Sequence, residues 1–329
     1  MHHPPPHPQT PSTTDIPAKS STVSVPDPLF FPLNNNERLV EWLADVSQES
    51  LETVRQRLHR EECSPGSNVN EEFHAMGLQP HVWSDRLIDF YGRTHAFLYE
   101  STTWNRMPFK MGMRRWIAEY LLETGTEPLD ILVYGDGLGF DSLYLSQAGH
   151  RVTYFEVSAA GREFAARLFE AHNAPVTILR DADQIEEQQY DVVACLDVLE
   201  HVPEPTSLVK SFHRYLKPKG RLVVNAPFYM LTPEYLTHLK CNRHYSGDLR
   251  RLYESHGFTM IDGHTTWNPL VLANCATNDL PPESRRLRRF KIRVAGLILS
   301  SGRFWGLPLE IAARVLKRPD KTWRIGLGG

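Results

Sequence analysis

Asp130-Ile-Leu-Val-Tyr-Gly135-Asp-Gly137-Leu-Gly139 is the stretch of this 329-residue chain that decides its fold. An apolar run ends in three glycines spaced two residues apart, and an amphipathic stretch over 140–147 follows at once. That order predicts a strand, a tight turn and a helix. Glycine lets a backbone turn sharply and approach a ligand closely, and the amides that open the helix point at that ligand. The stretch therefore predicts a binding turn for a nucleotide-like ligand.

The spacing of the glycines separates two kinds of nucleotide site. The dinucleotide fingerprint is G-x-G-x-x-G, with an acid about 20 residues further on. Here the third glycine, Gly139, comes one residue early, and Phe140 holds the position that the fingerprint gives to glycine. An NAD-dependent oxidoreductase is therefore the disfavoured alternative.

Strand and helix signals alternate through residues 129–278, which is the pattern of a parallel α/β sheet. We expect strands at 130–134, 152–156, 176–179, 190–195, 220–225, 258–263 and 269–275, and helices at 140–148, 159–172, 205–216 and 247–256. No helix separates the last two strands, so they should form an antiparallel hairpin. The predicted fold class is α/β, a Rossmann-like seven-stranded sheet of five parallel strands and this C-terminal hairpin, whereas a dinucleotide domain is expected to end in another parallel unit.

Polar residues follow several of these strands at their carboxyl ends, where a parallel sheet binds its ligand. Glu156 ends the second strand, and a carboxylate there can accept both hydroxyls of a ribose. Asp181 follows the third strand, and the fourth runs into Asp197-Val-Leu-Glu200-His201. We expect these side chains to meet at one edge of the sheet.

Together with the turn Leu216-Lys-Pro-Lys-Gly-Arg-Leu, these motifs resemble class I S-adenosylmethionine (SAM) methyltransferases over roughly residues 108–276. The chain is similar to the group that includes the ubiquinone-biosynthesis O-methyltransferases. The resemblance implies SAM as cofactor, with Asp181 on the adenine amino group and the amide of Ala182 facing the adenine ring. The cofactor residues that it implies, with Asp197 added, are Gly135, Asp136, Gly137, Gly139, Glu156, Asp181, Ala182 and Asp197.

The methionine end of the cofactor is where this sequence departs from the family. The acid expected two residues before the first glycine is replaced by Val133. Asp136 or Asp141 would take its role, or this protein holds that end of SAM differently. Both aspartates would otherwise be solvated residues at the start of a helix, which favours negative charge. Arg114 or Arg115 would pair with the SAM carboxylate from the preceding helix, or else lie on a solvated helix face.

Asp197, Glu200 and His201 share one face if their stretch forms a helical turn, and two carboxylates with an imidazole can hold a divalent metal. His244 is a candidate further ligand. A similar E-x-x-E-H stretch is associated with metal in some ubiquinone and small-RNA O-methyltransferases, yet D-x-L-E-H also occurs in relatives without one, where the histidine caps or packs the loop. His201 or His244 would otherwise act as a catalytic general base, because histidine titrates near neutral pH.

The flanks of the core have distinct compositions. Residues 1–28 are rich in Pro, Ser and Thr and predict a disordered tail, and residues 29–128 predict a helical N-terminal cap. Residues 279–329 predict a basic, amphipathic helical extension, with twelve Arg or Lys and two acids from Arg285 onward. That extension suits an anionic membrane surface, or equally an anionic protein or nucleic acid, or it docks as helices on the core.

Composition narrows the partners and the compartment. The formal net charge of -3 gives no indication of a nucleic-acid partner. Four scattered cysteines without a C-x-x-C pair favour a reducing cytoplasm, and no signal peptide or run of 18 apolar residues is present. Aromatic residues in the cap would form helix core or line an acceptor pocket: Trp83, Phe90, Tyr91, Tyr99 and Trp104.

We therefore expect an enzyme that is a SAM-dependent methyltransferase, cytoplasmic or peripheral at the membrane through residues 285–329. Its acceptor would be an oxygen of a small molecule or a lipid. N- or C-methylation and a SAM-binding protein without catalysis are the alternatives.

Overall fold

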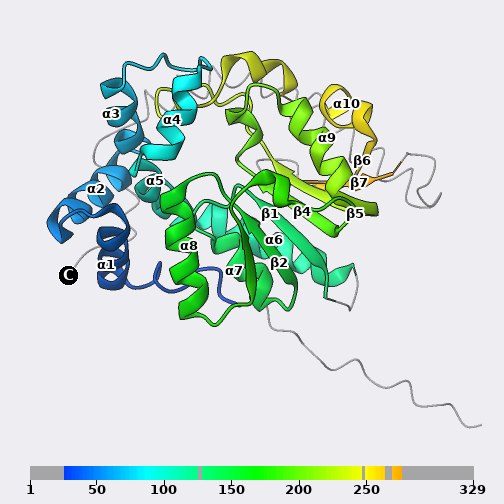
Figure 1. Ribbon diagram of the computed structural model, residues 1–329, viewed down its shortest axis with the longest axis horizontal. Coiled ribbons are helices and arrows are strands. Elements are labelled where there is room, and N and C mark those ends of the chain that lie inside the picture. Colours follow the sequence, from blue (N-terminus) through cyan, green and yellow to red (C-terminus); the bar gives the residue numbers. More distant parts are fainter. Residues whose placement is uncertain (1–25, 125–127, 247–248, 264–268, 276–329) are drawn as a thin grey trace, which may run out of the picture.

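The computed structural model describes residues 26–124, 128–246, 249–263 and 269–275 (Figure 1). The described chain has a helical N-terminal part beside a sheet with helices on both faces. Residues 1–25 of the predicted tail and the whole predicted basic extension lie outside the described residues. Within the described ranges, no helix combines the length and the apolar character that a bilayer crossing requires.

The N-terminal part is built from short capped helices. Asn35 caps the first by accepting the amide of Arg38 at 3.1 Å, and Ser50 caps the second by accepting the amide of Thr53 at 3.1 Å. Pro108 opens the last of them, at a position where a missing amide costs nothing. The helices are α1 (Asn36–Ser47), α2 (Leu51–Cys63), α3 (Ser67–Ala75), α4 (Asp85–Arg93), α5 (Ala96–Arg106) and α6 (Pro108–Glu123).

The predicted seven-stranded sheet is confirmed. Its order is β3-β2-β1-β4-β5-β7-β6, with parallel pairs from β3 to β5 and antiparallel pairs of β7 with β5 and β6. The strands are β1 (Asp130–Tyr134), β2 (Arg151–Phe155), β3 (Val176–Leu179), β4 (Tyr190–Leu196), β5 (Leu216–Asn225), β6 (Phe258–Gly263) and β7 (Leu270–Asn274). Strand β5 begins earlier than predicted because Leu216 already pairs with Tyr190.

Helices cover the sheet through two apolar cores, which alternate along each strand. Ile131 and Val133 of β1 belong to one core and Leu132 to the other, as a pleated strand requires. The first core is covered by α6, α7 (Phe140–Gln147) and α8 (Ala159–Ala171), and the second by α9 (Pro205–Tyr215). The predicted helix over 247–256 is confirmed only in part, because its described residues form a short helix, α10 (Leu249–Leu252), followed by the separate 3-10 turn η4 (Glu254–His256).

The segment before α1 packs against the rest of the described chain instead of extending away from it. The hydroxyl of Tyr144 donates to the carbonyl oxygen of Pro26 at 3.0 Å, and Arg114 donates to that of Pro28 at 2.8 Å. Phe30 is 7% exposed. Residues 26–28, placed in the disordered tail by sequence, are therefore held by hydrogen bonds that sequence composition does not reveal.

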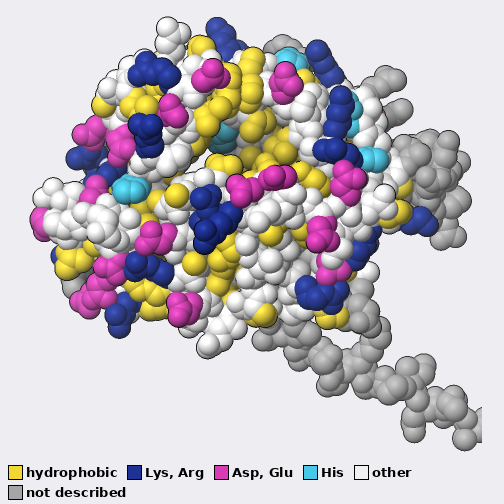
Figure 2. Space-filling view, viewed as in Figure 1, with side chains coloured by type: hydrophobic (Ala, Val, Ile, Leu, Met, Phe, Trp, Pro, Cys, Tyr) yellow, Lys and Arg dark blue, Asp and Glu magenta, His cyan; other side chains and the backbone are white. Residues whose placement is uncertain are grey.

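The strand order reverses between β1 and β4, and a crevice at the carboxyl ends of such strands is where open α/β sheets bind ligands. The space-filling view has a hollow in the middle of the visible face, lined by hydrophobic side chains (Figure 2). Helices α3 and α4 and part of the chain after β5 lie above this hollow, with the sheet and α8 below it (Figure 1).

Candidate functional site

The glycine turn between β1 and α7 is shaped by packing on two sides and is open on the third. Gly135, Gly137 and Gly139 all have left-handed φ, at 75°, 57° and 81°. A Cβ on Gly135 would overlap Val198, and one on Gly139 would lie 2.8 Å from the Cβ of Ala165. At Gly137 the nearest atom would be the Oγ of Ser101, 3.6 Å away. Gly137 is therefore the glycine beside which a ligand has room.

Glu156, the acid predicted to bind a ribose, joins β2 to this turn. Its Oε2 accepts the amide of Gly137 at 2.8 Å and its Oε1 accepts the amide of Ser158 at 2.8 Å. Burial raises the pKa of Glu156, and these amides oppose the rise. A carboxylate has about four acceptor positions, so each oxygen keeps capacity for a ligand hydroxyl.

Asp181 and Ala182 lie in an exposed loop at the carboxyl end of β3. Gln184 builds this loop, because its Oε1 accepts the amides of Arg180 at 2.9 Å and Asp181 at 3.1 Å. The pairing of Phe155 with Leu179 brings the loop beside Glu156. Gln184 was not predicted, since its role depends on the local turn geometry.

Asp136 lies in the glycine turn before α7 and caps the first turn of that helix. Its carboxylate accepts the amides of Asp141 at 3.1 Å and Ser142 at 2.7 Å. Asp141 is 6% exposed and so is not a solvated residue. Burial raises the pKa of Asp141, but the cations of Lys110 and Arg114 outweigh burial and hold that pKa below its ordinary value.

Arg114 is 2% exposed, so its placement on a solvated helix face is wrong. Its Nε donates to the Oδ1 of Asp141 at 2.8 Å, and other donors reach the carbonyl of Pro28 and the Oδ1 of Asn105. The side chain predicted to bind the cofactor carboxylate is thus directed at protein groups. Arg115 is exposed.

Lys110, one helical turn before Arg114, reaches the crevice instead. Its Nζ donates to the Oδ2 of Asp141 at 2.8 Å and lies 4.0 Å from the Oδ2 of Asp197. Asp197 accepts the indole Nε1–H of Trp104 at 3.2 Å and the Nδ2–H of Asn225 at 2.6 Å. The sequence alone assigned no role to Lys110 or Asn225, and left Trp104 between helix core and acceptor pocket.

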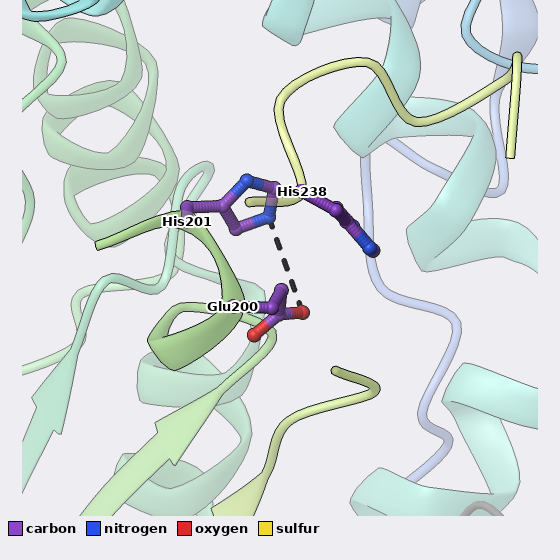
Figure 3. Close-up of side chains that lie close together, drawn as sticks. All are labelled: Glu200, His201 and His238. Atoms are coloured by element: carbon purple, nitrogen blue, oxygen red, sulfur yellow. Dashed lines mark ion pairs between the residues drawn. The ribbon is translucent and has the colours of Figure 1, made fainter. Parts of the chain in front are cut away.

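Glu200 and His201 come together with His238, from the irregular segment after β5 (Figure 3). One ligand atom of each lies within 4.8 Å of the others. Glu200 is 1% exposed, and neither of its carboxylate oxygens nor the Nδ1 of His238 has a hydrogen-bond partner in the described chain. The Nε2 of His201 lies 3.9 Å from the Oε1 of Glu200, and its Nδ1 lies 3.2 Å from the hydroxyl of Tyr91.

The predicted partners of Glu200 and His201 lie elsewhere. Asp197 has a left-handed φ of 60°, so the helical turn η2 (Leu199–His201) begins only after it and the three side chains do not share one face. Its oxygens serve Trp104 and Asn225. His244 is exposed and packs on Tyr245, with ring centroids 4.0 Å apart. The structure therefore does not bring His244 to the cluster.

Burial sets the charge of this cluster. It raises the pKa of Glu200 well above its ordinary value, and the carboxylate of Asp197 adds to the rise. It also lowers the pKa of His201 to about 4 and holds the pKa of His238 well below its ordinary value, where the neighbouring His201 adds to the effect. The two imidazoles are therefore neutral near pH 7 and have lone pairs to offer a cation.

Comparison with known families adds an independent finding. Residues 132–224 match the family model described as a methyltransferase domain. The chain contains a class I methyltransferase domain. Ubiquinone biosynthesis O-methyltransferase from Pseudomonas aeruginosa (strain UCBPP-PA14) is 36% identical over 115 residues, which are 33% of this chain and 48% of the relative. Its counterpart from Pseudomonas entomophila is 33% identical over 113 residues, 32% of this chain and 47% of the relative.

The chain thus spans about half the length of the curated relatives that it matches. Among solved structures, a putative O-methyltransferase from Nostoc punctiforme aligns with a TM-score of 0.47 at 14% identity, covering 66% of this chain and 70% of that one. Magnesium protoporphyrin IX methyltransferase from Synechocystis, solved with bound SAM, aligns with a TM-score of 0.41 at 20% identity, covering 58% and 96%.

The helix α5, outside the matched methyltransferase domain, faces its glycine turn. Ser101 lies over Gly137, and Trp104 donates to Asp197. Glu100 shares this face with Trp104, four residues on, and burial raises its pKa to about 8. The charge of Glu100 also acts on the hydroxyls of Tyr91 and Tyr235.

The aromatic residues of the N-terminal helical part differ in what they contact. Phe90 and Tyr99 are fully buried, and Trp83 packs against the same helical core as Phe90. Tyr91 contacts His201, and Trp104 contacts Asp197. Helical periodicity places all five on apolar faces, but it does not reveal which face meets the methyltransferase domain.

Proposed function

We propose that this protein transfers a methyl group from SAM to an oxygen of a small-molecule or lipid-type acceptor. The observation that carries the proposal is the open side of Gly137, whose amide is held by Glu156 at the carboxyl end of β1. The choice of oxygen follows the relatives named as O-methyltransferases. N- and C-methylation remain the alternatives.

The residues have separable roles in this proposal. The glycine turn and Glu156 would hold the ribose, and Asp181 with the amide of Ala182 would hold the adenine. SAM supplies an activated methyl group, so alignment of the acceptor accounts for most of the acceleration. The α5 face that carries Glu100, Ser101 and Trp104 would cover the bound cofactor and exclude water from the hollow.

We further propose that Glu200, His201 and His238 hold a divalent cation, in place of the predicted set with Asp197. Their buried, unpartnered oxygens and nitrogen fit such an ion, because an unsatisfied buried carboxylate is costly without compensation. The mixed oxygen and nitrogen donors suit Mn²⁺, Fe²⁺ or Zn²⁺. A cation held there would acidify and orient an acceptor hydroxyl. Without an ion, His201 is the candidate general base.

We also propose a role for each of three parts of the chain. Residues 129–278 would be the methyltransferase core, 29–128 its cap and 279–329 a basic extension that contacts anionic membranes. Flotation of the full chain with phosphatidylserine vesicles, beside a chain that lacks residues 285–329, tests the last part. Equal binding by both chains would remove the extension from the proposal.

Calorimetric titration with SAM, its product S-adenosylhomocysteine and NAD tests the function. We expect SAM and its product to bind and NAD not to bind. Labelled SAM incubated with fractionated cell extract would then identify the acceptor. Binding of NAD without SAM would overturn the assignment, and SAM binding without transfer to any fraction would favour a binding protein that lacks catalysis.

A further inference from the structure

We infer that Glu100 selects the methyl acceptor, by binding a protonated amine that the acceptor carries in addition to the oxygen that is methylated. The acceptor is then a cationic small molecule, and its ammonium lies between the Glu100 carboxylate and the side chains of Tyr91 and Tyr235. This inference rests on the proposed function and deepens it, because it concerns the chemical class of the acceptor and not the binding of the cofactor.

Glu100 lies on the side of α5 that faces the methyltransferase domain. At the next position, the Oγ of Ser101 is the nearest atom to the open side of Gly137. One helical turn before Glu100, Phe97 stacks on Tyr91 with ring centroids 5.3 Å apart. The helix therefore holds Glu100 between the glycine turn on one side and an aromatic cluster on the other.

The aromatic cluster continues from Tyr91 into the segment after β5. The hydroxyl of Tyr91 lies 3.2 Å from the Nδ1 of His201, and the rings of His201 and His238 meet with centroids 4.7 Å apart. His238 stacks in turn on Tyr235, with ring centroids 5.1 Å apart and planes 16° from parallel. The two tyrosines thus flank the histidine pair of Figure 3, and the charge of Glu100 acts on both of their hydroxyls.

The Glu100 carboxylate has no counter-charge in the part of the chain that the structure describes. Among those residues no donor hydrogen-bonds to it and no cation pairs with it. Burial raises the pKa of Glu100 to about 8, and the negative charge of Glu61 adds to the rise. The side chain is only half-buried, so a ligand can reach it. An ammonium would satisfy this carboxylate well, because charge-assisted hydrogen bonds are about twice as strong as neutral ones.

The surroundings of the two tyrosines also favour a cation over a neutral or anionic acceptor. Their ring faces attract cations, and an acceptor carboxylate would be repelled by the acids nearby. The strongest charges that act on the Tyr91 hydroxyl are those of Glu100, Glu200 and Glu156. Those that act on the Tyr235 hydroxyl are the charges of Glu100, Asp197, Glu234 and Glu61.

Cation exchange separates the two classes of acceptor before the assay. A deproteinised cell extract is passed over a cation-exchange resin at pH 7, and the retained fraction and the flow-through are each incubated with the full chain and labelled SAM. We expect labelled product from the retained fraction and none from the flow-through. Product from the flow-through, with or without product from the retained fraction, would overturn the inference.

The variant Glu100→Gln separates acceptor binding from a structural role. Its apparent KM for the retained fraction should rise at least about tenfold, the loss of one charge-assisted hydrogen bond. Calorimetry should keep its affinity for S-adenosylhomocysteine within about twofold, because glutamine has the same shape and Glu100 makes no hydrogen bond to the glycine turn. The exposed control Glu254→Gln should change neither quantity.

The other outcomes are also decisive. An unchanged apparent KM in Glu100→Gln, or equal weakening of the acceptor and of S-adenosylhomocysteine, would overturn the inference. Product from neither fraction would overturn the proposed function, and with it the inference that rests on it. Urea unfolding shows whether Glu100→Gln is folded, and if it is not, the fractionation with the wild-type chain alone decides.

Discussion

Asp141 and Glu200 are both almost fully buried acids, 6% and 1% exposed, yet they differ in their hydrogen-bond partners and in the direction of their pKa shifts. Asp141 receives two cationic side chains at 2.8 Å, and its pKa is lowered. Glu200 has no hydrogen-bond partner for either carboxylate oxygen in the described chain, and its pKa is raised. Burial alone therefore does not determine the state of an acid. Asp141 completes a scaffold, whereas the carboxylate oxygens of Glu200 have no hydrogen-bond partner among the described residues.

The largest effect should come from the satisfied acid. Asp141→Asn leaves Lys110 and Arg114 buried without their counter-charge, and we expect a loss of about 3–5 kcal/mol in the free energy of unfolding. Urea denaturation at pH 7 measures it. The exposed acid Asp183 gives the matched control, and Asp183→Asn should change stability by no more than about 0.5 kcal/mol.

The same carboxylate predicts the direction of acid sensitivity. Its folded-state pKa is depressed to about 2, so its stabilisation is present above the unfolded-state pKa and is lost as the pH falls from about 4 toward 2. Asp141→Asn should remove that part of the acid transition. An unchanged stability at pH 7 would mean that the two cations find other partners, and Asp141 would no longer differ from Glu200.

The glycines of the turn differ in a similar way, because Gly139 is packed against protein atoms and Gly137 has an open side. Gly139→Ala places a methyl 2.8 Å from Ala165 at a left-handed φ, and should cost about 2–4 kcal/mol from strain and overpacking. Gly137→Ala meets no such overlap, and should cost about 1–2 kcal/mol from its φ alone. Urea denaturation of both variants checks the order.

Ligand binding should reverse that order. Gly137→Ala, although the milder change for the fold, should weaken S-adenosylhomocysteine more than its own stability loss indicates, since the added methyl faces the open side of the turn. If Gly137→Ala binds S-adenosylhomocysteine as wild type does, the ligand does not approach the turn at Gly137. The open side of Gly137 would then no longer support the proposed function.

Local sequence patterns predicted the scaffold well. All seven strands, the glycine turn and Glu156 follow from periodicity and spacing within short windows. What remained hidden depends on distant segments meeting. His238 reaches His201 because the amide of Leu239 donates to the carbonyl of Glu200 at 2.9 Å, which fixes the segment after β5 against η2. No spacing in the sequence reports that contact.

The cation beside Asp197 could not be identified from sequence for a different reason. The sequence analysis assigned Arg114 or Arg115 to the cofactor carboxylate and gave no role to Lys110, which lies one turn before Arg114 on the same helix. The structure separates them through Pro28 and Asn105, which take the donors of Arg114. Similarly, the left-handed φ of Asp197 breaks the helical spacing on which the predicted metal set depended.

The unsatisfied acid should respond to a cation. Mn²⁺ added at about 100 times its dissociation constant should stabilise the wild-type protein by about 2.7 kcal/mol, because it binds only the folded state. Glu200→Gln should lose this response without the destabilisation of Asp141→Asn, since it removes no partnered charge. Thermal unfolding with and without Mn²⁺ measures both.

Two further variants test where the ion binds. His238→Gln should lose the Mn²⁺ response, and His244→Gln should keep it, because His244 is exposed beside Tyr245. An equal response in wild type and Glu200→Gln would leave the buried carboxylate unexplained and remove the cation from the proposal.

The smallest effect concerns Glu100, a second acid whose charge burial disfavours. Its pKa is raised to about 8 by burial, with the nearby carboxylate of Glu61 adding to the rise. Between the unfolded-state pKa and about pH 8 the folded protein binds the extra proton, so stability falls as the pH rises through that window. Glu100→Gln has no such proton, so its free energy of unfolding relative to wild type should be higher at pH 8 than at pH 5.

Urea denaturation of wild type and Glu100→Gln at pH 5, 6.5 and 8 measures this difference, with the exposed Glu254→Gln as control. Parallel curves for wild type and Glu100→Gln would mean that water or a neighbour already satisfies Glu100. Glu100 would then resemble Asp141, whose charge the folded protein compensates. Diverging curves would instead show that Glu100 resembles Glu200. Its charge, on the α5 face beside the glycine turn, would then be compensated only by a bound donor. An acceptor hydroxyl or ammonium in the hollow would be that donor, and its binding should then require Glu100.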